Sequence, residues 1–151
     1  MNAVTLQRTI AAPPDEVYRT WLEPDLIQRW MAPGDLEATR VEVDARVGGA
    51  YRVWHGDAGG FEAEILELVP GERLAFRWGF VGPDRLDGPV YDSLLTVTLR
   101  ETPGGGGTEL TLVHERLEAL HDAMPDVAER VNYGWASALD KLAMAAPPSA
   151  R

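Results

Sequence analysis

Residues 125–144 read PDVAERVNYGWASALDKLAM, and this stretch decides the fold. Its apolar residues recur at steps of three and four, the spacing that gives a helix one apolar face; they are Val127, Val131, Trp135, Ala138, Leu139 and Leu142. Pro125 and Asp126 suit a first turn, because proline has no N–H to leave unpaired and a carboxylate is favoured at the positive end of the helix dipole. The stretch predicts one long amphipathic helix whose apolar face must be covered.

Most of the preceding chain reads as strands. Residues 4–10 alternate between apolar and polar side chains, and six further strand segments follow from residue 38 onward, separated by Gly and Pro. Their short connections favour antiparallel neighbours, because a parallel crossover needs a dozen or more residues. Residues 15–22 and 24–31 carry two brief helical patterns. We therefore expect an α+β fold, with one curved sheet against the long helix; the six later strands are 38–44, 49–56, 61–69, 72–81, 91–101 and 107–115.

Length and composition narrow the class of protein. A chain of 151 residues fits one domain, which we place at residues 1–146, with a disordered tail at 147–151. The net charge of −10 argues against nucleic acid as a partner, since that surface would need positive potential. No cysteine is present, and no basic-then-apolar leader or long apolar run occurs. These features predict a cytoplasmic protein without a membrane span.

Strand alternation places aromatic side chains on the face that the helix would cover. Phe76 and Trp78 have the same parity on one strand, and Trp30 and Trp135 come from predicted helices. Two interpretations stay open: the rings fill the core, or they leave a cavity for an apolar ligand. In the second case we expect the cavity to be lined by Trp30, Arg52, Trp54, Glu64, Phe76, Trp78, Tyr91, His114 and Trp135.

The polar members of that set would orient the polar end of a ligand. Arg52 is a long donor beside aromatic residues, which suits a carboxylate, although a surface ladder with Glu62 or Glu64 would explain it equally well. Glu64 shares a strand face with Glu62. His114 ends the inward face of its strand, so it is a candidate acid, base or polar anchor, against the simpler alternative of a hydrogen-bonded strand-end histidine.

No pattern in the sequence predicts a metal or cofactor. The three histidines lie far apart, and no His-x-x-x-His occurs. We interpret His55 as a turn residue, and His121 with Asp122 as a loop or helix-cap pair. Ser93 has no His or Asp at a spacing that suggests nucleophilic catalysis. The chain is thus assigned no catalytic residue, no metal and no cofactor.

Several motifs in order resemble one family. They are WLEP (21–24), QRWMAP (28–33), DARVGGAYR (44–52), LVPGERL (68–74), GTELTL (107–112) and GW (134–135). Together they resemble the domain named after the activator of the heat-shock protein 90 ATPase, within the START-like, or SRPBCC, superfamily. The resemblance implies a helix-grip fold, in which an antiparallel sheet of six to seven strands wraps the C-terminal helix and two short helices follow the first strand.

The resemblance also implies a cavity for apolar molecules between sheet and helix, without naming a ligand or a reaction. Our first hypothesis is therefore the binding of a small hydrophobic molecule. One alternative is a protein-partner module that binds a chaperone or forms a homodimer. Another is a cyclase- or hydrolase-like enzyme that uses His114 or Glu64.

Overall fold

Seven strands form one antiparallel sheet in a computed structural model that describes residues 3–32, 38–56, 60–81, 91–123 and 125–145. The strand order is β1-β7-β6-β5-β4-β3-β2, so every neighbouring pair except β1 and β7 is consecutive in sequence. The strands are β1 (Val4–Ile10), β2 (Arg40–Val43), β3 (Ala50–Trp54), β4 (Gly60–Val69), β5 (Arg73–Val81), β6 (Tyr91–Glu101) and β7 (Thr108–Glu115).

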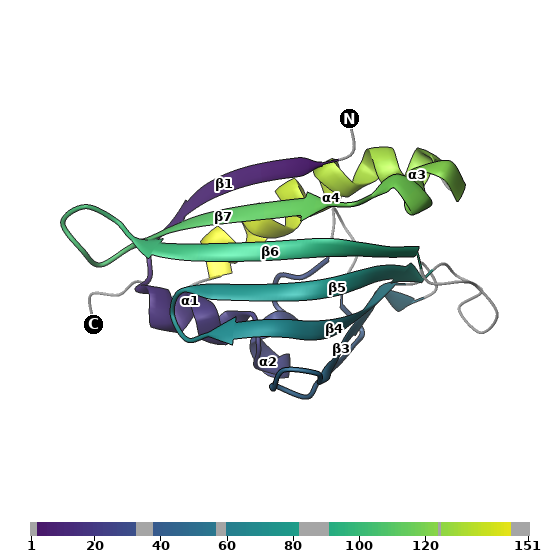
Figure 1. Cartoon of the computed structure of the whole chain (residues 1–151). Helices are drawn as coiled ribbons and strands as arrows, with labels where there is room; N and C mark the ends of the chain where they lie inside the picture. Colours follow the sequence, from purple (N-terminus) through teal and green to yellow (C-terminus); the bar gives the residue numbers. More distant parts are fainter. Residues whose placement is uncertain (1–2, 33–37, 57–59, 82–90, 124, 146–151) are drawn as a thin grey trace.

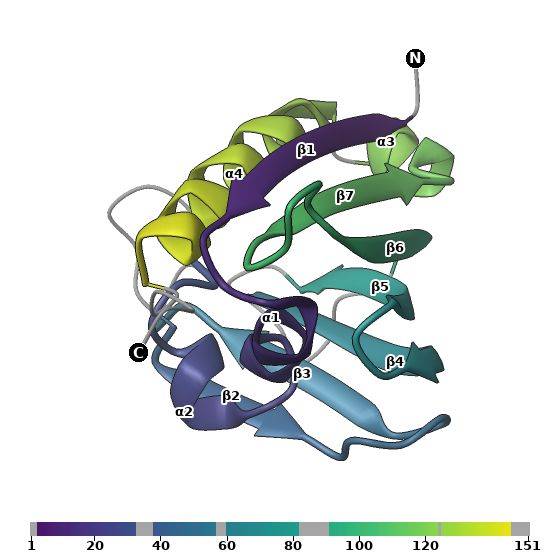
Figure 2. The same cartoon turned by 90° about the vertical axis from the view of Figure 1, so that its left-hand side faces the viewer.

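All four helices of the described chain connect to or cover this sheet (Figure 1). Figure 2 shows the sheet curving, with α4 along its inner side next to β1 and with α1 and α2 further along the same side. The inner face is therefore covered, whereas the other face of the sheet is open (Figures 1 and 2). The helices are α1 (Pro14–Thr20), α2 (Pro24–Ile27), α3 (Glu118–Ala123) and α4 (Pro125–Ala145).

The expected helix-grip architecture is confirmed, and each strand lies within two residues of its expected bounds. Helix α3 was not expected, because its buried side consists of Leu120 and of Leu117, which directly precedes the helix, and two apolar residues are too few for a pattern. His121 and Asp122 therefore lie in a helix. The expected tail, 147–151, lies outside the described residues.

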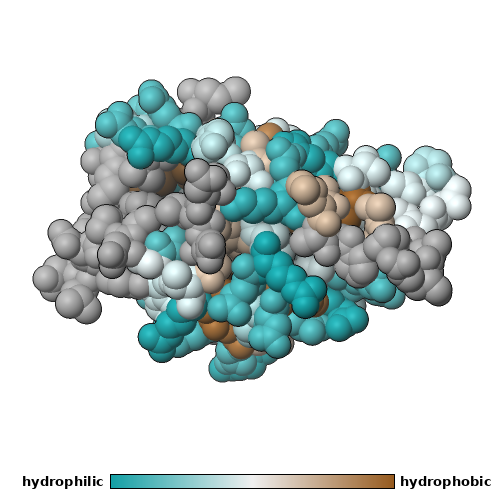
Figure 3. Space-filling view, turned by 180° about the vertical axis from the view of Figure 1, so that it is seen from behind, coloured by the Kyte–Doolittle hydropathy of each residue, from teal (hydrophilic) through white to brown (hydrophobic). Residues whose placement is uncertain are grey.

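Helix α4 buries the face that its periodicity predicts. Val131, Trp135 and Leu139 are buried, together with Ala138 and Leu142. Strand β7 alternates buried and half-buried residues along its whole length, so its inner side also belongs to the core. Among the described residues, no helix combines the length and hydropathy needed to cross a membrane. Viewed from the helix side, the surface of the described residues shows small apolar patches among polar residues (Figure 3).

Candidate functional site

An aromatic cluster lies between the inner face of the sheet and α4. Trp135 from α4 lies 6.1 Å from Trp21, 6.2 Å from Phe61 and 6.5 Å from Trp78, measured between ring centroids. These separations are the ones at which aromatic rings are in contact. The cluster joins α1, α4 and the sheet, and consists of Trp21, Trp30, Tyr51, Phe61, Phe76, Trp78, His114 and Trp135.

A chain of hydrogen bonds runs through this apolar cluster. The Trp135 indole N–H donates to His114 Nδ1 at 3.0 Å. His114 Nε2 lies 2.7 Å from Ser93 Oγ, and Ser93 Oγ donates to the Trp78 backbone carbonyl at 3.0 Å. Both His114 and Ser93 are buried. These hydrogen bonds connect α4 to three adjacent strands, β7, β6 and β5, through buried side chains.

The donor and acceptor of each hydrogen bond in this series follow from the two groups at its ends, the Trp135 N–H and the Trp78 carbonyl. An indole N–H can only donate, so His114 Nδ1 must accept and the imidazole proton must lie on Nε2. Nε2 then donates to Ser93, whose own hydroxyl proton goes to the Trp78 carbonyl. Burial lowers the pKa of His114 to about 3, because a low-dielectric interior disfavours the charged imidazolium. His114 is therefore neutral, in a single tautomer.

The contact between Ser93 and His114 corrects the sequence interpretation, which gave Ser93 no histidine companion. Antiparallel pairing of β6 with β7 brings the two side chains together. A serine nucleophile needs a histidine nitrogen that accepts the hydroxyl proton. Here that nitrogen carries the proton, and an indole N–H occupies the position where a carboxylate would orient the imidazole. As arranged, the pair holds the core together and does not activate Ser93.

Two further tryptophans in the cluster have indole N–H groups that are not hydrogen-bonded. Among the described residues, the N–H groups of Trp21 and Trp78 are buried and have no hydrogen-bond acceptor. A buried donor without a partner costs about 1–3 kcal/mol. By contrast, the Trp30 indole N–H donates to the Thr20 carbonyl at 3.1 Å, and the Tyr51 hydroxyl to the Trp21 carbonyl at 2.5 Å. The unpaired donors are thus confined to two of the rings.

The structure brings together five of the nine residues expected to line a cavity. Trp30, Phe76, Trp78, His114 and Trp135 all have less than 7 % of their surface exposed and belong to the aromatic cluster.

Three other members of the set lie on the opposite face of the sheet. Alternation along β3 turns Tyr51 and Val53 inward and therefore Arg52 and Trp54 outward. The Arg40 guanidinium lies 5.0 Å from the Trp54 ring centroid, a cation–π contact. The expectation that Arg52, Trp54 and Glu64 share one cavity with the inner aromatics is therefore wrong. The side chain of Tyr91 lies outside the described residues.

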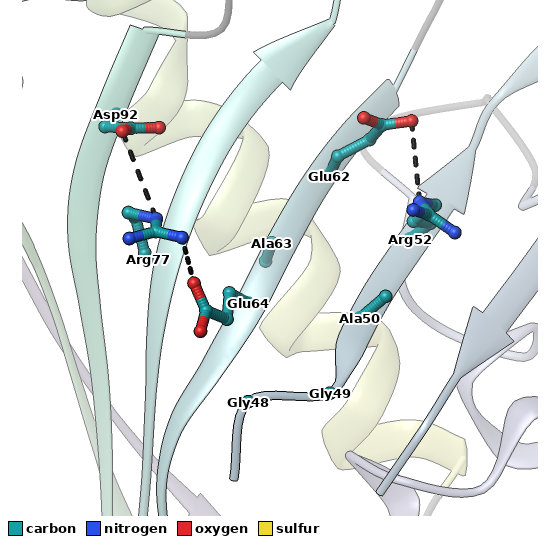
Figure 4. A pocket seen from close by; sticks show the side chains of 9 residues that line it. All are labelled: Gly48, Gly49, Ala50, Arg52, Glu62, Ala63, Glu64, Arg77 and Asp92. Atoms are coloured by element: carbon teal, nitrogen blue, oxygen red, sulfur yellow. Dashed lines mark hydrogen bonds and ion pairs between the residues drawn. The ribbon is translucent and has the colours of Figure 1, made fainter. Parts of the chain in front are cut away.

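The outer face carries alternating charges across the strands. Arg52 pairs with Glu62 at 3.7 Å, while Arg77 pairs with Glu64 and lies 4.0 Å from Asp92 (Figure 4). These residues surround an open depression of about 400 Å³ whose floor includes Gly48, Gly49, Ala50 and Ala63. Helix α4 lies behind the sheet in this view (Figure 4). The ladder is the alternative that the sequence left open for Arg52.

Sequence reasoning did not select Trp21 and Phe61 as site residues. Trp21 follows α1 directly as its C-cap, in a segment too short to show which way it faces. Phe61 lies on the inward-facing side of β4, as the alternation of side chains along that strand already indicated. Within the described residues, no group of three or more His, Cys, Asp or Glu side chains is placed to bind a metal ion.

Comparison with known protein families identifies the family to which this fold belongs. Residues 11–146 match the model of the family described as Activator of Hsp90 ATPase homolog 1-like protein. The chain belongs to this family. The match includes α1, α2 and α3, the sheet from β2 onward and the whole of α4.

Similar proteins show how far the likeness extends. The mouse protein named Activator of 90 kDa heat shock protein ATPase homolog 1 is 29% identical over 134 residues, which are 87% of this chain and 33% of that protein. The chain thus spans about a third of the length of the curated relatives that it matches.

Two of the solved structures that share the fold illustrate the likeness. Protein CV1439 from Chromobacterium violaceum is 34% identical, with a TM-score of 0.77 over 98% of this chain and 99% of the other. The Aha1 dimer from Colwellia psychrerythraea has a TM-score of 0.74, over 97% of this chain and 96% of the other. Its identity is 18%, so this likeness concerns the fold alone.

Proposed function

We propose that the protein binds a small, mainly apolar molecule between the inner face of the sheet and α4. The observation that carries the proposal is the pair of unpaired, buried indole N–H groups of Trp21 and Trp78 in an aromatic cluster. A core that serves only stability gains nothing from donors that lose their hydration without finding an acceptor. A ligand with an acceptor group would supply the missing bond.

The surrounding residues suit such a ligand. The aromatic rings offer apolar faces for stacking, and the hydrogen-bond chain through His114 holds α4 and β7 in fixed positions. The described rings already touch one another, so the ligand gains room by shifting them. Burial of roughly 300 Å² of apolar surface contributes several kcal/mol at about 25 cal/mol per Å². Association entropy offsets much of this gain, so we expect micromolar affinity.

The test is native mass spectrometry of freshly purified protein, followed by fluorescence titration with a lipophilic-compound library. We expect a co-purified small molecule, or saturable quenching, since four of the five tryptophans lie in the cluster, namely Trp21, Trp30, Trp78 and Trp135. In a matched pair of variants, Trp78→Ala should abolish the response, whereas Tyr133→Ala, at an exposed position of α4, should leave it unchanged. A clean apo mass with no response to any compound would refute the proposal.

A second candidate function is a protein-partner module. It is supported by the name of the mouse relative, an activator of a heat-shock protein ATPase, and by the dimer formed by the Colwellia protein. Light scattering would detect a homodimer of this chain. Co-sedimentation with a purified 90 kDa heat-shock protein would detect the other partner, and a monomer that binds no chaperone would exclude this candidate.

A further inference from the structure

We infer that the ligand is a neutral aromatic or polycyclic molecule with a carbonyl group, and that this carbonyl accepts a hydrogen bond from the Trp78 indole N–H. The inference rests on the proposed function and deepens it, because it names the chemical class that the aromatic cluster would select. Three properties of the cluster lead to this inference: it carries no charge, its free hydrogen-bonding groups are donors, and Trp78 is in contact with several other rings.

The described interior has no counter-ion for a charged ligand. Its buried polar residues are Thr20, Ser93, Thr108 and His114. None of these carries a charge near neutral pH, since burial lowers the pKa of His114. An ionised carboxylate or ammonium group would lose its hydration there without gaining a partner, which makes its burial unfavourable. The ligand must therefore be neutral at the end that enters the cluster.

The free polar groups of the described cluster are donors. The indole N–H groups of Trp21 and Trp78 have no acceptor among the described residues. The side chains able to accept are those of His114, Ser93 and Tyr51, and each already takes part in a hydrogen bond, with Trp135, with each other or with a backbone carbonyl. A ligand that brings an acceptor completes a hydrogen bond, whereas a ligand that brings a donor adds one more unpaired group. The cluster therefore favours a carbonyl over an N–H or O–H group.

Trp78 is the donor that a ligand is placed to meet. Its ring lies 5.4 Å from Phe61, 4.7 Å from His114 and 6.5 Å from Trp135, so it contacts rings from two other strands and from α4. Trp78 keeps 6 % of its surface exposed, whereas Trp21 keeps none. A flat molecule stacked among these rings would bring its edge to the Trp78 N–H.

The test uses molecules of one shape that differ at one position. Fluorene, 9-fluorenone and carbazole carry CH₂, C=O and N–H at the same ring position; indane, 1-indanone and indoline form a smaller series. Isothermal titration calorimetry of the full chain with all six gives relative affinities. We expect the ketone to bind about tenfold more tightly than the hydrocarbon in at least one series, with the N–H analogue no tighter than the hydrocarbon. Apolar burial alone would rank the hydrocarbon first.

Two variants connect the preference to one N–H group. Trp78→Phe keeps an aromatic ring and removes the donor, so the preference for the ketone should vanish. Trp54→Phe is the matched control: Trp54 lies on the outer face of the sheet, with its ring centroid 5.0 Å from the Arg40 guanidinium, so the preference should remain. Circular dichroism confirms that each variant is folded. If Trp78→Phe does not fold, the ranking of the six compounds on the unaltered chain decides the question.

The outcomes separate the two proposals. Equal binding of ketone and hydrocarbon, or tighter binding of the hydrocarbon, would overturn the carbonyl inference and leave the apolar site in place. Retention of the ketone preference in folded Trp78→Phe would likewise overturn the role of this N–H. If none of the six compounds binds, the proposed ligand site itself fails, and the inference fails with it.

Discussion

The indole N–H of Trp135 on α4 donates a hydrogen bond to Nδ1 of His114 on β7, over a distance of 3.0 Å. Both side chains are at least nine-tenths buried, so the bond is shielded from competition with water. It defines how the long helix sits on the sheet, because apolar packing alone tolerates small rotations of a helix whereas a hydrogen bond does not. Helix placement and the protonation state of one histidine are therefore coupled.

Replacement of His114 by Leu should destabilise the fold strongly. The variant leaves the Trp135 N–H without an acceptor and Ser93 Oγ without its donor, and a buried unpaired group costs about 1–3 kcal/mol. We expect a loss of about 2–4 kcal/mol in the free energy of unfolding, measured with urea. His121→Leu is the control, since the His121 side chain is 53% exposed and the change should cost less than about 0.5 kcal/mol. Equal losses would show that the chain of hydrogen bonds contributes little.

Stability should also fall as the pH decreases below 6.5. The folded-state pKa of His114 is lowered to about 3, while an unfolded histidine titrates near 6.5. Between these values the unfolded state binds a proton that the folded state does not, so the free energy of unfolding decreases as pH falls, by about 2 kcal/mol between pH 7 and 5. His55, whose pKa burial also lowers, adds a contribution of the same sign.

The His114 contribution is isolated by comparison with His114→Gln, which does not titrate. The variant is less stable at pH 7, but its stability should depend less steeply on pH between 7 and 5, while His55 contributes in both proteins. Denaturant titrations at several pH values give both slopes. Parallel slopes would mean that His114 is protonated in the folded protein at mild pH.

Most of the fold could be predicted from the sequence, because it depends on the local periodicity of apolar residues. The three- and four-residue spacing in α4 and the two-residue alternation in β7 each specify a buried face, and both faces are where these periods place them. Gly and Pro gave the turns between strands. Helix α3 was missed, since one buried leucine within it, Leu120, and one just before it, Leu117, are too few to show a period.

The candidate site was harder to predict, because it depends on which segments meet in space. Alternation along the strand already placed Arg52 and Tyr51 on opposite faces of the sheet. The presence of arginine near aromatic residues in the sequence nevertheless suggested a shared cavity. The partnership of Ser93 with His114 depends on the register of β6 against β7, which no spacing within either strand reveals. The unpaired N–H of Trp21 depends on how the end of α1 docks.

Gly49 should tolerate no side chain, in contrast to its neighbour. A Cβ at Gly49 would overlap the Asp44 backbone carbonyl and lie 2.9 Å from that of Arg46, and backbone atoms cannot move aside cheaply. Gly49→Ala should therefore cost more than about 2 kcal/mol. A Cβ at Gly48 would meet nothing within 4 Å, so Gly48→Ala should cost only about 1–2 kcal/mol, from its φ of +87°. Thermal melting of both variants makes the comparison; similar melting temperatures would contradict the close approach.

Arg52→Ala and Glu64→Gln should leave ligand affinity unchanged, because both side chains lie on the face of the sheet opposite α4 (Figure 4). The measurement is calorimetric titration of each variant with 9-fluorenone, and we expect dissociation constants within twofold of that of the unaltered chain. Their effect on stability should stay below about 1 kcal/mol, since ion pairs between half-exposed groups are screened by water. A tenfold loss of affinity in either variant would instead place the ligand's polar end in the outer depression, and the aromatic cluster would then be core alone.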